Sequence, residues 1–208
     1  MDEPYPASDF DAWAQEYDLS VGKDAFPFWG YPTCIQRIAT ISKAQPGQQV
    51  LDLGSGTGNL ALHFARLGCE LWCTDFSPLM LEEARRKLPG AHFLLHDLRR
   101  PLPADWAGPF DAIVSAYVFH HFPLEEKVAI LLACSRRLAP AGRMILGDIA
   151  FADAPAMEAV RLLTGPDWEQ EEYWLADEAL PALENAGFKV EYEQVSRCAG
   201  LFSLWNNQ

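Results

Sequence analysis

Short apolar strands alternate with amphipathic helices through the middle of this chain, from Gln48 to Gly147. Each parallel strand has to be reached by a crossover from the far end of the strand before it, and a helix is the usual crossover. The alternation therefore predicts an α/β fold whose mainly parallel sheet is covered by helices on both faces. The predicted strands are residues 50–53, 71–74, 92–95, 112–115 and 143–147, with a turn at 140–142 before the last.

The two ends of the chain differ from this middle part. Phe10, Trp13 and Tyr17 recur at helical spacing, and Ile35–Ile41 indicates a second helix that ends near Pro46. We expect these two helices to form a lid. Two helices and two strands follow the alternating part, and the strands predict an antiparallel pair at one edge of the sheet. They are expected at residues 157–163, 177–185, 188–195 and 201–205, with a turn near residue 200.

The composition argues against several classes of protein. The 208 residues include 29 acidic and 16 basic ones, and a net charge of −13 would repel a nucleic-acid backbone. The apolar stretches are far shorter than the roughly 20 residues of a membrane span. The start of the chain resembles no secretory or mitochondrial leader, so we expect a cytoplasmic protein. Five cysteines without a C-x-x-C pair favour free thiols over disulfides or structural zinc.

The loop after the first predicted strand carries three closely spaced glycines, Gly54, Gly56 and Gly58. Glycines let the backbone approach a ligand, and the next helix presents free amides at its N-terminus. Asp75 stands about 20 residues beyond this loop, where a carboxylate can accept hydrogen bonds from ribose hydroxyls. These features predict a nucleoside site. The alternatives are a tight strand-to-helix turn and a helix-cap acid near Ser77.

The glycine spacing is G-x-G-x-G, tighter than the G-x-G-x-x-G of dinucleotide-binding folds. Val50–Gly58 resembles the first motif of the class I S-adenosylmethionine-dependent methyltransferases, and Asp75 with Ser77, Pro78 and Met80 resembles the second. Further similar segments are residues 96–98, 110–115 and 138–143. The resemblance covers nearly the whole chain. It implies a Rossmann-like fold with a seven-stranded sheet, S-adenosylmethionine as cofactor and S-adenosylhomocysteine as product.

The resemblance also implies roles for individual residues. An acid such as Asp75 takes the ribose, and an acid such as Asp97 hydrogen-bonds the adenine amino group beside the Leu98 amide. Asp52 faces the methionine end, over which a lid tyrosine such as Tyr17 closes; the alternative for that residue is an ordinary buried aromatic. The implied cofactor-binding residues are Tyr17, Asp52, Gly54, Ser55, Gly56, Asp75, Phe76, Met80, Asp97, Leu98 and Ser115.

Tyr117, His120 and His121 follow the fourth predicted strand, where the acceptor approaches the methyl group in this family. Methyl transfer is a direct displacement that needs orientation and exclusion of water more than an acid or a base. A histidine here could nevertheless accept a proton from the acceptor, so these three are the candidate catalytic residues. The alternative is that one histidine pairs with Glu125 or Glu126, or packs under Phe122, while the other faces solvent.

We expect no metal at the histidine pair. Adjacent histidines of one short segment are poorly placed to share an ion, and no carboxylate stands at a matching helical spacing. Asp148 ends the fifth predicted strand and is a further candidate for contact with acceptor or lid. Trp168, Tyr173 and Trp174 lie in an acidic segment, which predicts either a cover over a small acceptor or a satellite cluster beside the C-terminal helices.

Residues 10–14, 17–18 and 117–122 resemble one small bacterial branch of the family, linked with the recycling of methionine sulfur towards cysteine. Acceptors in that branch are poorly defined. We expect one domain, 1–208, made of a helical lid (1–46), a cofactor-binding core (47–150) and an acceptor cover with edge strands (151–208). The expected function is methyl transfer to an unidentified small molecule. A nicotinamide-dependent oxidoreductase and a non-catalytic S-adenosylmethionine-binding module are the alternatives, and the oligomeric state stays open.

Overall fold

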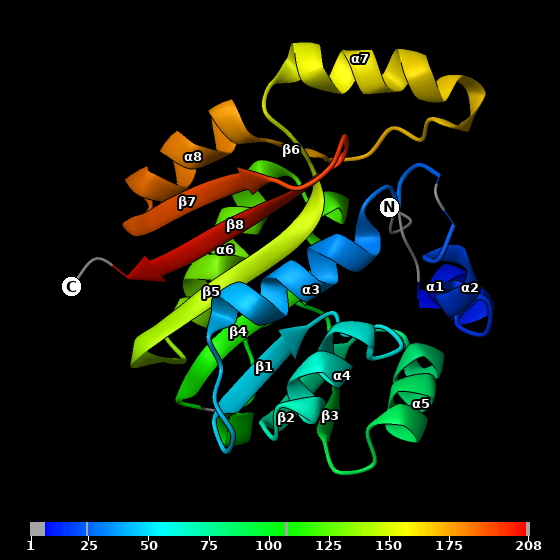
Figure 1. Ribbon diagram of the computed structural model, residues 1–208. Helices are drawn as coiled ribbons and strands as arrows, with labels where there is room; N and C mark the ends of the chain where they lie inside the picture. Colours follow the sequence, from blue (N-terminus) through cyan, green and yellow to red (C-terminus); the bar gives the residue numbers. More distant parts are fainter. Residues whose placement is uncertain (1–6, 24, 107, 207–208) are drawn as a thin grey trace.

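The computed structural model describes residues 7–23, 25–106 and 108–206. Its sheet has the strand order β3-β2-β1-β4-β5-β8-β7 (Figure 1). The first five of these strands run parallel, whereas β8 is antiparallel to both β5 and β7. The strands are β1 (Gln49–Leu53), β2 (Glu70–Asp75), β3 (His92–Leu95), β4 (Phe110–Ala116), β5 (Leu138–Phe151), β7 (Phe188–Gln194) and β8 (Ala199–Asn206). The predicted parallel sheet with an antiparallel C-terminal edge is confirmed. A two-residue β6 (Trp174–Leu175), too short to leave a sequence pattern, also pairs with β5.

Helices cover both faces of this sheet. On one face lie α3 (Tyr31–Ser42) and α4 (Asn59–Arg66), and on the other lie α6 (Leu124–Ser135) and α8 (Ala176–Asn185). The central strands are apolar because both of their faces are buried, as in parallel sheets generally. The remaining helices are α1 (Ala7–Trp13), α2 (Tyr17–Ser20), α5 (Pro78–Lys87) and α7 (Ala154–Thr164), with 3₁₀ turns η1 (Ala104–Trp106), η2 (Phe119–His121) and η3 (Gly165–Asp167).

The start of α5 follows from its local sequence. Ser77 is the N-cap, and its hydroxyl accepts a hydrogen bond from the Met80 amide at 3.1 Å. Pro78 takes the first helical position, where a missing N–H costs nothing. The helix therefore begins directly after Asp75, at the carboxyl end of β2.

The structure corrects the expectation that both N-terminal helices form a lid. The second of them, α3, buries Cys34, Ile35 and Ile38 in the core cluster on one face of the sheet. It belongs to the layer that covers the sheet. The helices α1 and α2 lie apart from that layer, beside α5 (Figure 1), and we call these two the lid. Residues 1–6 of the expected lid lie outside the described residues.

Two predicted turns are part of strands. Residues 140–142 lie within β5, where Phe110 of β4 pairs with Leu138 and Ala112 pairs with Arg143. The extra residues of β5 form an irregularity in its pairing with β4. The sequence 140–142 therefore distorts the strand locally but does not end it. Gly200 lies within β8, opposite Asp148 of β5.

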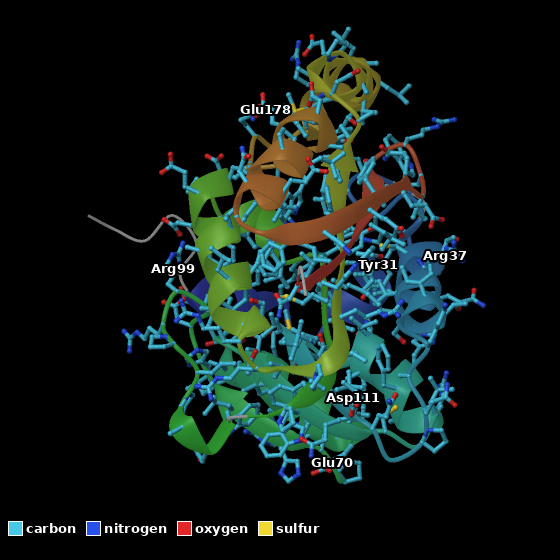
Figure 2. The ribbon with its side chains drawn as sticks, turned by 90° about the vertical axis from the view of Figure 1, so that its left-hand side faces the viewer. Tyr31, Arg37, Glu70, Arg99, Asp111 and Glu178 are labelled. Carbon is cyan, nitrogen blue, oxygen red and sulfur yellow. The ribbon has the colours of Figure 1, made fainter. Side chains whose placement is uncertain are left out.

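Many charged side chains lie on the surface. Arg37, Glu70 and Glu178 project outward in Figure 2. All five cysteines are free thiols, as their spacing predicts. Among the described residues, no helix has the length and apolar character needed to cross a bilayer.

Gly147 marks the closest approach of α3 to β5. A Cβ placed there would lie 2.5 Å from Cys34 Sγ and 2.9 Å from Leu201 Cδ2. Gly147→Ala is expected to lower the free energy of unfolding by about 1–3 kcal/mol, because overpacking forces the helix away from the strand. Urea unfolding measures this. Gly90→Ala is the matched control, since nothing lies within 4 Å of a Cβ at that position. Equal free energies for the two variants would contradict the packing argument.

Candidate functional site

A cavity of about 480 Å³ opens at the carboxyl ends of β1, β2 and β4. Its walls come from the loops after these strands, from the lid, and from residues 167–173, a segment that we call the strap. Open parallel sheets bind ligands at this edge, where the strand order reverses. The predicted site residues that line the cavity are Tyr17, Asp52, Gly54, Ser55, Gly56, Asp75, Phe76, Met80, Asp97, Leu98, Tyr117, His120 and His121.

Ser115 is the one predicted site residue outside this lining. Its side chain is buried, and its hydroxyl donates a hydrogen bond to the Leu53 carbonyl at 2.7 Å. The residue therefore ties β4 to β1 behind the cavity wall.

The glycine loop after β1 is held close to the neighbouring strands. Gly54 has a φ of +66°, and a Cβ there would lie 2.5 Å from Val118 Cγ2, so only glycine fits. The Ser55 amide donates to the Thr74 carbonyl at 2.7 Å, and the Gly56 amide donates to Asp75 Oδ2 at 2.8 Å. The loop and the end of β2 thus form one rigid unit.

Two buried carboxylates face the cavity from adjacent strands. Asp75 accepts hydrogen bonds from the Gly56 and Ser77 amides, yet burial raises its pKa to about 6. Burial and the nearby charge of Asp75 raise the pKa of Asp52 well above its ordinary value. In the part of the chain that the structure describes, neither carboxylate oxygen of Asp52 has a close hydrogen-bond partner, and the nearby Ala61 amide only partly offsets the rise in its pKa. This end of the cavity therefore calls for a positively charged or donor-rich ligand.

The part of the cavity next to Asp75, around Phe76 and Met80, is more apolar. Met80 is buried, and Phe76 packs edge-on against Phe10 with ring centroids 4.9 Å apart. Asp97 accepts a hydrogen bond from the Arg99 amide at 3.0 Å through Oδ1. Apolar side chains beside a carboxylate and a backbone amide suit a planar heterocycle with polar edges.

The lid is fastened to this unit by two aspartates that sequence reasoning did not single out. Asp11 accepts from the Ser77 hydroxyl at 2.6 Å and from the Leu79 amide at 3.2 Å. Asp18 accepts from Thr57 at 2.7 Å, Asn59 at 2.9 Å and Lys87 at 2.5 Å, and we call these contacts the Asp18 latch. Both acids lie in segments that resemble one branch of the family, but only contacts between distant segments reveal their role in holding the lid.

Tyr117 has a strained backbone at the end of β4. Its φ of +56° is rare for a large side chain, and such strain is frequent at functional sites. The ring is buried against Tyr31, with centroids 5.0 Å apart, and against Phe28. Its hydroxyl is buried and has no hydrogen-bond partner among the described residues.

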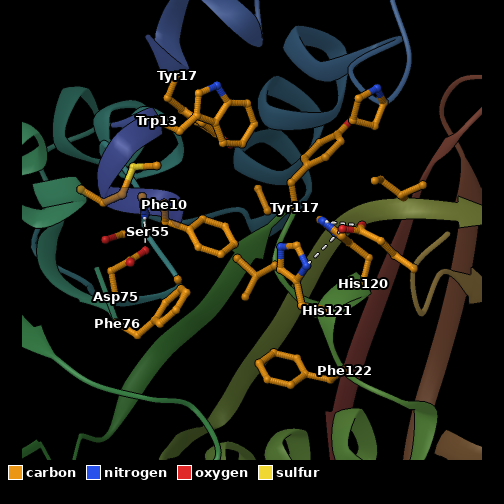
Figure 3. A pocket seen from close by; sticks show the side chains of 18 of the residues that line it. Phe10, Trp13, Tyr17, Ser55, Asp75, Phe76, Tyr117, His120, His121 and Phe122 are labelled. Carbon is orange, nitrogen blue, oxygen red and sulfur yellow. Dashed lines mark hydrogen bonds and ion pairs between the residues drawn. The ribbon is translucent and has the colours of Figure 1, made fainter. Parts of the chain in front are cut away.

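The histidine pair contacts two carboxylates, Asp148 and Glu171. Figure 3 shows His120 and His121 side by side, across the cavity from Asp75. His120 Nδ1 lies 2.5 Å from Asp148 Oδ1. Glu171 of the strap lies 3.4 Å from His120 Nε2 and 3.5 Å from His121 Nδ1. The sequence alternative of a pairing with Glu126 is not what the structure contains, because that residue pairs with Arg99 at 3.1 Å.

The charges of this cluster are mutually dependent. Burial alone would lower the pKa of His120, but Asp148 and Glu171 raise it above its ordinary value. Burial and the neighbouring His120 lower the pKa of His121. Lys127, whose pKa burial lowers to about 8, donates to the Glu172 carbonyl and lies 4.3 Å from the centre of the Trp174 ring. It fixes the strap against α6.

Comparison with known proteins decides the family. The family model of a methyltransferase domain matches residues 50–142. An uncharacterized methyltransferase of Geobacillus kaustophilus is 31% identical over an alignment of 201 residues, and the match covers 89% of each chain. One from Anoxybacillus flavithermus is 33% identical over an alignment of 206 residues, and the match covers 90% of this chain and 92% of the relative. This chain is a class I S-adenosylmethionine-dependent methyltransferase.

The solved structures agree with this assignment at the level of the fold. The magnesium protoporphyrin IX methyltransferase of Synechocystis PCC 6803 with bound SAH has a TM-score of 0.76 and 18% identity, over 97% of this methyltransferase and 98% of that chain. Neither the nicotinamide alternative nor the non-catalytic alternative gains support from these comparisons.

The Asp18 latch should control how often the lid opens. Asp18→Ala removes all three of its contacts, and a partly exposed network of this kind contributes about 1 kcal/mol. Hydrogen exchange of residues 11–21, followed by mass spectrometry, is expected to become about fivefold faster while the sheet is unaffected. Glu16→Ala, an exposed neighbour in the same segment, is the control. Unchanged exchange in Asp18→Ala would show that the latch does not hold the lid.

Proposed function

We propose that this methyltransferase binds S-adenosylmethionine in the cavity and transfers the methyl group to a small-molecule acceptor, releasing S-adenosylhomocysteine. The observation that carries the proposal is the buried pair of carboxylates, Asp52 and Asp75, of which the first has no close hydrogen-bond partner among the described residues beyond the weak support of the Ala61 amide. A ligand with a sulfonium, an ammonium group and ribose hydroxyls supplies the charge and the donors that these acids lack.

The cofactor would lie along the carboxyl ends of β1 and β2. Asp75 is assigned to the ribose, and Asp97 with the Leu98 amide to the edge of the adenine, between Phe76 and Met80. The methionine end is assigned to Asp52 and to the amides of Gly54, Ser55 and Gly56, with Tyr17 above it. The negative charge of this end favours the sulfonium cofactor over its neutral product, which helps the product to leave.

The acceptor would approach from the opposite side, where Tyr117, His120 and His121 line the cavity. These three residues are proposed to contact its nucleophilic atom. A cavity of about 480 Å³ lies in the lower half of the range of roughly 300–1,000 Å³ for ligand sites, so a nucleoside cofactor leaves space only for a small acceptor. The aromatic rings of Phe10, Phe28 and Tyr173 favour one with an apolar body.

The reaction is a direct in-line displacement. A bond forms between the acceptor atom and the methyl carbon while the carbon–sulfur bond breaks, and its electron pair goes to the sulfur, which loses its positive charge. Orientation and exclusion of water can supply roughly 7–11 kcal/mol of the acceleration. The lid and the strap serve this purpose, because they close the cavity above the sheet edge.

Three finer assignments belong to the same proposal. Residues 1–208 would act as one domain, with the cofactor on 47–150 and the acceptor cover in 151–208. Free thiols at all five cysteines support a reducing compartment such as the cytoplasm. The motifs at residues 10–14, 17–18 and 117–122 support membership of the bacterial branch linked with methionine sulfur recycling.

A labelling experiment tests the transfer itself. The purified protein is incubated with methyl-labelled S-adenosylmethionine and the small-molecule fraction of a bacterial extract. We expect a labelled product and one equivalent of S-adenosylhomocysteine. Binding of S-adenosylhomocysteine without any labelled product would contradict the proposed catalysis.

Asp75 should make cofactor binding depend on pH. Its pKa of about 6 means that the carboxylate is ionised above this pH and protonated below it, so affinity is lost as the pH falls. Calorimetry with S-adenosylhomocysteine is expected to show a dissociation constant that rises by up to about tenfold per pH unit below this value. Asp75→Asn should weaken binding by about 10- to 100-fold and remove that slope. The exposed Asp105→Asn is the control, and a slope retained in Asp75→Asn would assign the titration elsewhere.

A further inference from the structure

Three potential metal ligands converge on the acceptor side of the cavity. His120 and His121 come from η2, and Glu171 comes from the strap. One ligand atom of each lies within 4.8 Å of the others. The sequence argument against a metal considered only nearby residues, whereas the fold brings the carboxylate from far along the chain. The 3₁₀ turn also sets the two rings side by side, with centroids 4.1 Å apart.

The spacing of the ligand atoms is close to that of a tetrahedral zinc site. Zinc–ligand bonds of about 2.0–2.1 Å place neighbouring ligands about 3.3 Å apart. His120 Nε2 lies 3.4 Å from Glu171 Oε2, and His121 Nδ1 lies 3.5 Å from Glu171 Oε1. Small rotations of side chains would complete the arrangement, because the exposed fraction of the Glu171 side chain, 12%, leaves it some freedom at the cavity wall.

Asp148 prepares His120 as a ligand. Its carboxylate accepts from His120 Nδ1, from the His120 and Ile149 amides, and from the Trp174 indole at 3.1 Å. A fully satisfied buried carboxylate keeps the proton on Nδ1, so Nε2 offers its lone pair to the cavity. Histidine ligands of metals are held in this way by a carboxylate behind them, which fixes the ring and raises its basicity.

The strap is held in place independently of Glu171. The Glu172 amide donates to the His120 carbonyl at 3.0 Å, and Lys127 donates to the Glu172 carbonyl. These contacts set the backbone beside the histidine turn, so the fold holds Glu171 within reach of both histidines while its side chain can still rotate. A group of ligands held by surrounding contacts in advance is what a metal site requires.

We propose that His120, His121 and Glu171 bind a divalent transition-metal ion of the zinc class, with Asp148 as the residue that positions His120. Two histidines and one carboxylate leave a fourth position open, as in catalytic zinc sites, and here that position faces the cavity. The ion would occupy a net acidic cluster and balance the charges of Glu171 and Asp148.

The role of the ion rests on the proposed methyl transfer, whereas its binding does not. At the open position it would take an acceptor with a hydroxyl or thiol group. Coordination lowers the pKa of that group, its proton goes to solvent, and the resulting anion attacks the methyl carbon while the carbon–sulfur electron pair goes to sulfur. The site thus selects acceptors with an ionisable oxygen or sulfur, because an acidic cavity without a metal would disfavour the anion that each of them forms.

Cobalt(II) reports directly on such a site. The full chain, freed of metal with a chelator, is titrated with Co²⁺ and followed by visible absorption, and with Zn²⁺ by competition calorimetry. We expect one ion per chain and the intense absorption of four-coordinate cobalt. Glu171→Gln should weaken binding at least about tenfold, and Asp148→Asn about 10- to 100-fold, the range found for residues behind metal ligands.

The exposed pair of His92 and Glu70, 3.3 Å apart, provides the matched control. His92→Ala should leave metal binding unchanged, which separates the site from adventitious binding to surface histidines. Equal Co²⁺ affinity in the wild type and in Glu171→Gln would overturn the proposal, and so would the absence of four-coordinate absorption. Thermal unfolding identifies any variant that fails to fold, and His121→Asn then replaces it.

Titration with S-adenosylhomocysteine on the same samples distinguishes the two proposals. Metal binding without S-adenosylhomocysteine binding would retain the metal site and remove the methyl transfer. If the chain binds S-adenosylhomocysteine and forms labelled product but takes no Co²⁺, the methyl transfer stands and the metal site is overturned. Faster transfer to a hydroxyl or thiol acceptor on addition of Zn²⁺, absent in Glu171→Gln, would support both.

Discussion

The cavity depends on buried acidic groups that, within the described residues, have no cation beside them. Asp52 and Asp75 end adjacent strands and face one cavity, and their pKa values are raised because burial disfavours the charged form. The fold tolerates them because glycine-loop and helix amides hold the second carboxylate, while the first is left for a ligand. Such an arrangement weakens the protein when it is empty and gives selectivity for a cationic ligand.

The same edge of the sheet carries a second set of buried acids with a different environment. Asp148 of β5 is saturated with donors and its pKa is lowered despite burial, chiefly by His120. Asp52 is therefore left short of donors, whereas Asp148, behind the histidine pair, is fully hydrogen-bonded. The break in strand order between β1 and β4 separates the two, so that a cofactor and an acceptor can meet across it.

Local sequence patterns predict most of the framework and half of the site. Periodicity locates every long strand, and the signals at Gly54 and Asp75 lead to two residues that line the cavity, because both lie at the ends of neighbouring strands. Contacts across the chain are different: residues 17–18 belong to a segment that resembles one branch of the family, but no sequence signal gives Asp18 or Glu171 its partners, because these depend on which distant residues the fold brings beside them. The position of α3 on the sheet was missed for a related reason, since an amphipathic helix does not reveal which surface covers its apolar face.

Phe10 of the lid touches both sides of the cavity. Its ring lies 4.9 Å from that of Phe76 and 5.4 Å from that of His121, measured between centroids, and it stands between Asp75 and His121 in Figure 3. A single aromatic side chain thus borders both the Asp75 side and the His121 side of the cavity. A displacement of α1 would therefore uncover the Asp75 side and the His121 side of the cavity at the same time.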